Sequence, residues 1–294
     1  MKIQIHICHP ESRVFARERI QSFISLLFLL TFFSCNPSPP KTKTPRYIVT
    51  SPEVAEIISL IQGTKNIVGI TAECTFPVEL KTKKVVGTFG KVDYEKIISL
   101  QPTHVFTSAL EQDAIASELD KLNIKTVQIY PKSISELISS IREIGKNLDE
   151  IDRANFVADS LQIRIDQLVV SNSSTYHSSV YIEIYGNPLM SVSDDSFVGE
   201  LLTASGGKNV FSKLPRDYSR IKPEKVIEAN PEIIILTYPG ISAEDIQNRK
   251  GWEVISACQT GKIYSIKDID PDLILRASPR VIEGISKLQE LLSK

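Results

Sequence analysis

Two glutamates, Glu95 and Glu224, occupy the same place in two copies of one pattern, at residues 93–108 and 222–237. Each copy has a Glu-Lys pair opening a short apolar helix, a proline that ends the helix, and an apolar run typical of a buried strand. A repeat this long indicates two copies of one α/β lobe rather than a solenoid. Equivalent carboxylates on two lobes suit a two-fold symmetric partner. A carboxylate in the first turn also stabilises a helix whatever its function.

The other chemically active residues match no catalytic pattern. The histidines, His104 and His177 among them, are scattered and have no metal-ligand spacing. The chain has no G-x-S-x-G elbow, P-loop or dinucleotide fingerprint. Its 34 Lys and Arg nearly balance 35 Asp and Glu without a basic stripe, which argues against nucleic acid as a partner. We therefore predict a protein that is not an enzyme and has no metal site and no cofactor.

The N-terminus has the features of an export signal. Three arginines precede the apolar run 23–33, which is shorter than the roughly 20 residues that span a bilayer but suits a signal-peptide core. The run ends at Ser34 and Cys35, a small residue before a cysteine, as at a lipoprotein processing site. We expect a signal peptide over 1–35 with acylated Cys35 and a solvated tether over 36–45. An ordinary signal peptide or a buried helix is the alternative.

The four cysteines do not make a disulfide framework. Cys8 would be lost with the signal and Cys35 would carry lipid, which leaves Cys74 and Cys258 in the mature chain. Their separation in sequence places them in different predicted lobes. We therefore expect two unpaired thiols.

Strands and helices alternate in both halves of the mature chain, which predicts mainly parallel sheets. Ser133 is the expected N-cap of one helix, with Glu136 completing a capping box. The predicted N-terminal lobe spans 46–147 and the C-terminal lobe 178–294. Expected helices are 52–61, 133–147, 197–204 and 279–292, and expected strands outside the repeats are 46–50, 66–70, 126–129, 180–184 and 261–266.

A single long helix is predicted to join the lobes over residues 148–171. Apolar residues recur there at helical spacing with no glycine or proline. At 1.5 Å per residue this helix is roughly 34 Å long and forms a stiff connector. We predict an α/β fold with two similar lobes, mainly parallel sheets, one rigid bridging helix and a ligand cleft between the lobes.

The chain resembles the substrate-binding proteins of ABC importers, of the class in which one helix bridges two lobes and the cargo is cobalamin, a ferric siderophore or haem. The resemblance covers almost all of the mature chain, and LRASPR makes it most similar to the cobalamin-binding branch. It implies a periplasmic or extracytoplasmic monomer, anchored to the membrane by lipid, that delivers a small-molecule metal chelate to an ABC permease and its ATPase subunits. Six sequence words carry it, in the family's order: TSPEVAEII, VGITAECTFP, VGTFGKVDYEKIISLQPTHV, IYGNPLMSVSDDSFVGELLTASGGKNVF, IKPEKVIEANPEIIIL and LRASPR.

The resemblance also implies roles for five residues that would contact the ligand. Phe89 and Tyr218 match aromatic positions that face each other across the cleft, and Tyr185 matches a third. Asp272 and Arg276 match polar positions on the ligand side. From the residues alone, the aromatics could equally pack within their own lobes. Asp272 and Arg276, four apart, could be a surface ion pair.

The resemblance further implies that Glu95 and Glu224 dock on arginines of the permease, one glutamate per lobe. The chain departs from the cobalamin-binding branch at two positions that bear on the ligand. Glu73 stands where cobalamin binders have Tyr, and Ser108 stands where one has Trp. Aromatic side chains cover a corrinoid face well, whereas a ferric siderophore would be held by Arg276 through charge-assisted hydrogen bonds.

We favour a corrinoid as the ligand, with a ferric siderophore or haem as alternatives in the same role. A chelatase-like enzyme and a structural surface lipoprotein are the remaining interpretations. Both alternatives differ from a binding protein in that neither would bind and release a coloured ligand unchanged.

Overall fold

The computed structural model describes residues 44–108, 112–172 and 177–294. The predicted signal peptide, Cys35 and nearly all of the tether lie outside these residues. Residues 45–294 form one compact unit. Within the described part of the chain, no helix has both the length and the apolar composition to cross a membrane.

Five parallel strands form the sheet of the N-terminal lobe, in the order β3-β2-β1-β6-β7. The central strands β1 and β6 are buried because they are short apolar runs covered on both faces. The predicted strands at 46–50, 66–70 and 126–129 are confirmed within a residue or two. The bounds are β1 Tyr47–Val49, β2 Ile67–Ile70, β3 Lys84–Val85, β6 His104–Thr107 and β7 Thr126–Gln128.

The sheet of the C-terminal lobe repeats this arrangement with four parallel strands in the order β11-β8-β13-β14. The bounds are β8 Ser179–Glu183, β11 Lys208–Asn209, β13 Ile233–Leu236 and β14 Ile263–Tyr264.

The two copies of the sequence repeat fold alike. Helix α3 (Tyr94–Ser99) leads to β6, and helix α8 (Pro223–Ala229) leads to β13. In each copy the residue before the proline is left-handed, with φ of 46° at Gln101 and 45° at Asn230. Each following strand then pairs in parallel with the first strand of its lobe. The prediction of two similar lobes is therefore confirmed.

Most predicted helices occur close to their expected bounds. Ser133 caps α5, because its hydroxyl accepts the Glu136 N–H at 3.0 Å. The capping box is wrong in its second half, since the Glu136 carboxylate accepts from the Lys132 N–H at 2.8 Å. The helices are α2 Pro52–Gln62, α4 Asp113–Lys121, α5 Ile134–Asn147, α7 Phe197–Ala204, α9 Ala243–Gln247, α10 Ser256–Thr260, α11 Asp272–Leu275 and α12 Val281–Leu292, with 3₁₀ turns η1 Val78–Thr82 and η3 Trp252–Val254.

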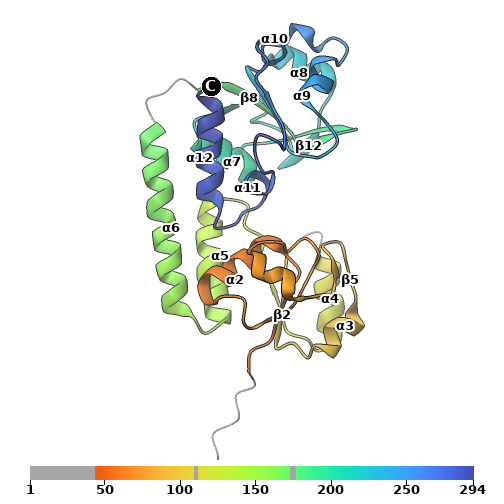
Figure 1. The fold of residues 1–294 in the computed structure, drawn as a ribbon, viewed down its shortest axis with the longest axis vertical. Coiled ribbons are helices and arrows are strands. Elements are labelled where there is room, and N and C mark those ends of the chain that lie inside the picture. The colour runs from red at the N-terminus through yellow and green to blue at the C-terminus, as the bar shows by residue number, and fades with distance from the viewer. Residues whose placement is uncertain (1–43, 109–111, 173–176) are drawn as a thin grey trace, which may run out of the picture. The chain divides into compact units, whose positions relative to one another are not determined.

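The bridging helix α6 spans Ile151–Asn172. It begins three residues later than the predicted start at 148, because Leu148 ends α5 and Asp149 is left-handed, with φ of 58°. It runs beside α5 and packs against α12 (Figure 1). Gly145 of α5 lies against Ala154 of α6, where a Cβ on the glycine would collide with the alanine side chain. The two helices therefore approach closely and form a stiff pair.

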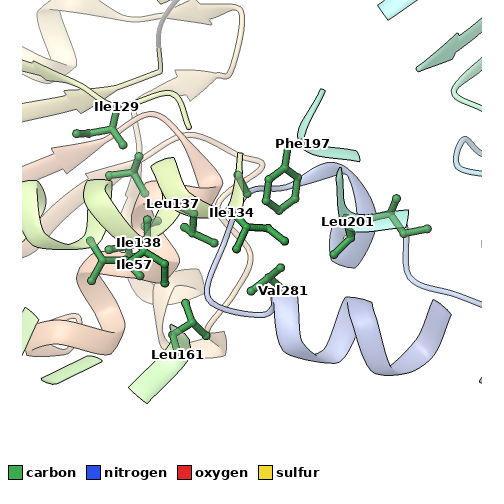
Figure 2. Packing of buried hydrophobic residues seen from close by; sticks show 14 of the residues in the cluster. Ile57, Ile129, Ile134, Leu137, Ile138, Leu161, Phe197, Leu201 and Val281 are labelled. Carbon is green, nitrogen blue, oxygen red and sulfur yellow. The ribbon is translucent and has the colours of Figure 1, made fainter. Parts of the chain in front are cut away.

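Helix α6 is not the only connection between the two lobes in the described part of the chain. The largest apolar core runs without interruption from the N-terminal lobe through α6 into the C-terminal lobe, from Ile57 and Leu137 through Leu161 to Val281 (Figure 2). The Ile134 N–H at the start of α5 also donates to the Glu200 carboxylate of α7 at 2.7 Å. Protein interiors pack at crystal-like density, so this shared core resists relative movement of the two lobes. Its effect adds to that of helix α6.

Two small antiparallel sheets carry the aromatic residues singled out in the sequence. One is the hairpin of β4 (Gly87–Thr88) and β5 (Lys91–Val92). The other contains β9 (Tyr185–Gly186), β10 (Leu189–Val192) and β12 (Tyr218–Arg220). Strands of two or three residues give almost no periodic signal, so the sequence did not predict these sheets.

Candidate functional site

A cavity of about 320 Å³ lies between the two lobes. Its volume is at the lower end of the roughly 300–1,000 Å³ typical of small-molecule sites, so a large ligand would enter it by one edge. Both lobes contribute to the lining, which consists of Glu53, Phe89, Ser108, Tyr130, Pro131, Lys132, Phe197, Asp217, Tyr218, Leu275, Arg276 and Ala277.

Phe89 reaches the cavity from the tip of the β4–β5 hairpin. Gly87 makes the hairpin possible, because its φ of 145° and the nearby Lys91 carbonyl leave no room for a side chain. The Phe89 N–H donates to the Glu73 carboxylate at 2.9 Å, and its carbonyl accepts from the Gln112 amide at 2.8 Å. The backbone that carries the aromatic ring is therefore held from both sides.

Gln112 joins this hairpin to the ends of two strands. Its amide also donates to the Thr50 carbonyl at 3.0 Å. Its side-chain oxygen accepts from the Ser108 N–H at 2.7 Å and the Thr50 hydroxyl at 2.8 Å. The side chain is fully buried and uses both donors and its acceptor. No local sequence pattern predicted this role, since a glutamine beside a helix start ordinarily faces solvent.

Tyr218 enters the lining from the C-terminal lobe. Its strand β12 pairs with β10, with Tyr218 opposite Val192. Next to it, the Asp217 carboxylate lies 3.8 Å from the Lys132 ammonium of the other lobe. Both charged side chains are partly exposed, so this pair adds little stability but sets opposite charges on the two walls.

Arg276 belongs to an ion-pair network that ties the lobes together. Its guanidinium lies 2.9 Å from the Asp272 carboxylate and 3.8 Å from that of Glu56, and it donates to the Glu73 carbonyl at 3.5 Å. Glu56, on α2 and only 4% exposed, accepts two hydrogen bonds from Arg280, at 2.9 and 2.8 Å.

The electrostatics of this network follow from its burial and its hydrogen bonds. Hydrogen bonding to Glu56 raises the pKa of Arg280, while burial raises the pKa of Asp272 despite the neighbouring Arg276 charge. The Arg276 charge is thus already matched by carboxylates before any ligand arrives.

Glu53 places a further carboxyl in the cavity, from the first turn of α2. Burial raises the pKa of Glu53, and hydrogen bonds with the Ser51 side chain and its own backbone, together with the Arg276 charge, only partly oppose this effect. Glu53 was not predicted as a site residue, because an acid after a serine and a proline is also what any helix start favours.

The five predicted ligand contacts separate into two groups. Phe89, Tyr218 and Arg276 come together in the cavity lining. Asp272 is not in the lining but contacts Arg276. Tyr185 is also outside it, is 52% exposed and packs against Tyr238 with ring centroids 6.1 Å apart. The ligand-binding roles of all five residues remain predictions.

Glu95 and Glu224 are exposed and lie in the first turns of α3 and α8. Neither side chain forms an ion pair with any other residue in the described ranges. Both helices lie on the sides of their lobes that face away from α6 (Figure 1). The two carboxylates are therefore available to a partner, and the docking role stays a prediction.

The two thiols of the described chain are free and buried, as expected. Burial raises the pKa of Cys74 to about 11 and also raises that of Cys258. Across residues 44–108, 112–172 and 177–294, no three His, Cys, Asp or Glu side chains gather as a metal-binding group.

Comparisons with known proteins agree with this architecture. The family model described as periplasmic binding protein matches residues 48–269. The chain is 29% identical over 257 residues to an uncharacterised ABC transporter substrate-binding lipoprotein, YvrC, of Bacillus subtilis, covering 84% of this chain and 80% of the relative. It is 24% identical to the vitamin B12-binding protein of Salmonella typhi, covering 85% and 91% of the two chains. The structure of the periplasmic haem-binding protein RhuT from Roseiflexus sp. RS-1 has the same fold, with a TM-score of 0.76 at 18% identity, over 85% and 98% of the two chains.

Proposed function

Since the chain belongs to the periplasmic binding protein family, we propose that it captures a metal chelate in the cavity between its lobes and delivers it to an ABC importer. This family consists of substrate-binding transport proteins, so the function needs no catalytic step. The observation that carries the proposal is the cavity itself, which Phe89 and Tyr218 line from opposite lobes. Aromatic rings on two walls suit a flat or compact chelate better than a small polar solute.

A corrinoid is the favoured cargo. The chain has a relative named as a vitamin B12-binding protein. The charge of Arg276 is also matched by Asp272 and Glu56, which leaves less of it for an anionic siderophore or for haem propionates. A ferric siderophore or haem in the same role is the alternative.

Delivery would use the two exposed glutamates and a membrane anchor. Glu95 and Glu224, one on each lobe, would pair with arginines of the two permease subunits. Acylated Cys35 would hold the protein at the extracytoplasmic face of the membrane, as a monomer. A Cys35→Ser variant should then accumulate as an unprocessed precursor, and processing of that variant to normal size would contradict the anchor.

The cargo is tested by equilibrium titration of the purified protein with cyanocobalamin, a ferric hydroxamate and haem. We expect one cyanocobalamin per chain, bound more tightly than the other two chelates. Preferential binding of the hydroxamate or haem would replace the corrinoid assignment. Binding of none of the three would overturn the proposed function.

A further inference from the structure

We propose that Glu53 selects the cargo by charge: its carboxylate accepts a hydrogen bond from an N–H group on the edge of the chelate and disfavours an edge that carries a carboxylate. The inference rests on the proposed function and specifies the class of chelate that this cavity takes. It predicts that amide-edged or ammonium-bearing chelates are preferred to the same chelates with acid groups.

Glu53 lies at the end of α2 that faces the cavity. A helix N-terminus attracts anions through its free N–H groups and its dipole. Here Pro52, which has no N–H, takes the first position of α2, and Glu53 in the same turn supplies a negative charge. The protein thus occupies with its own carboxylate the place where an anionic ligand group would otherwise be stabilised.

The charged side chains of the cavity lining differ in their partners. Four charged side chains line the cavity: Glu53, Lys132, Asp217 and Arg276. Lys132 pairs with Asp217, and Arg276 pairs with carboxylates outside the lining. Of these four, only Glu53 lacks an ion pair within the described part of the chain. Among the charged groups of the lining, the one without an ion pair is therefore an acid, and the Arg276 charge acts on it only at longer range.

The Glu53 side chain is also partly buried. Burial raises the pKa of the Glu53 carboxyl in spite of hydrogen bonds with Ser51 and its own backbone, so its charged form has lost hydrogen bonds to water that the protein replaces only in part. A ligand N–H replaces those bonds, whereas a ligand carboxylate adds a like charge in a site that excludes water. Because the cavity of about 320 Å³ admits only an edge of a macrocycle, the edge groups are the ones that Glu53 meets.

The test uses cyanocobalamin and its monocarboxylic derivatives, in which one peripheral amide is hydrolysed to an acid. Affinities are measured for the wild type, Glu53→Gln and the matched control Glu79→Gln, which removes an exposed carboxylate of the same lobe. We expect the wild type and the control to bind at least one acid derivative about tenfold or more weakly than cyanocobalamin. In Glu53→Gln this ratio should fall to less than about threefold. An unchanged ratio in Glu53→Gln, or no discrimination by the wild type, would overturn the role of Glu53 while leaving corrinoid binding intact.

Absence of cyanocobalamin binding would instead contradict the corrinoid assignment. The charge preference is then measured with a ferric hydroxamate that bears a free ammonium group and with its succinylated, anionic derivative. Preference of the wild type for the ammonium form, lost in Glu53→Gln, would support the inference. Equal binding of the two forms, or binding of neither, would overturn it.

Discussion

Removing one charge from the network that joins the lobes should destabilise the whole fold. In Glu56→Gln the carboxylate that accepts two hydrogen bonds from Arg280, at 2.9 and 2.8 Å, becomes a neutral amide of the same shape. Breaking a buried ion pair from one side costs about 3–5 kcal/mol. Arg280 keeps Asp270 at 3.5 Å and Arg276 keeps Asp272 at 2.9 Å, so we expect a loss somewhat below that range, about 2–3 kcal/mol.

The assay is reversible unfolding in urea, together with calorimetry. For a domain of this size about 2–4 °C of Tm corresponds to 1 kcal/mol, so Tm should fall by roughly 4–12 °C. Glu79→Gln, which removes an exposed carboxylate, should change the free energy of unfolding by less than about 0.5 kcal/mol. If Glu56→Gln lowered the free energy of unfolding no more than this control does, the ion-pair network would not hold the lobes together and the reasoning would fail.

Three further predictions concern docking, the thiols and pH. Glu95→Arg combined with Glu224→Arg should abolish uptake through the reconstituted permease while ligand affinity in solution is retained; surviving transport, or loss of ligand binding, would refute the docking role. In a chain whose other cysteines are replaced by serine, Cys74 and Cys258 should resist maleimide in the native state and react with it in denaturant, because burial raises the pKa of both thiols. Rapid labelling of the native protein would argue against buried thiols. Because burial raises the folded-state pKa of Glu53 above its unfolded value, ionisation costs stability at neutral pH and costs nothing once both states are protonated. Glu53→Gln should therefore be more stable than the wild type at pH 7 in urea unfolding, and the difference should shrink as pH falls toward about 4; a pH-independent difference would contradict the assigned cause.

Helices and strands could be predicted from the sequence wherever the spacing of apolar residues was regular over many neighbouring residues. Helix α6 follows from apolar residues such as Ala154, Leu161 and Ile165 at helical spacing, all of which are buried. The repeat identified α3 with β6 and α8 with β13, including the proline after each helix. The small antiparallel sheets were missed because their strands hold too few residues to show alternation.

The site was predictable only in part, for a different physical reason. Resemblance indicated Phe89, Tyr218 and Arg276, which the fold brings into one cavity. Glu56 depends for its role on Arg280, which is 224 residues further along the chain. Gln112 forms hydrogen bonds with Thr50 and Ser108, which follow two different strands. Interactions of this kind depend on tertiary packing, and no local spacing records them.

The most direct test of the account is whether the cavity between the lobes binds the cargo. Phe89→Ala, Tyr218→Ala and the double variant are titrated with cyanocobalamin, and Phe156→Ala, which truncates an aromatic ring that is 63% exposed on α6, is the control. Each cavity variant should lose about 1–3 kcal/mol of binding free energy, because an aromatic ring that the bound ligand would cover is removed, and the control should bind as the wild type does. Wild-type affinity in both single variants and in the double variant would contradict the account and place the ligand elsewhere.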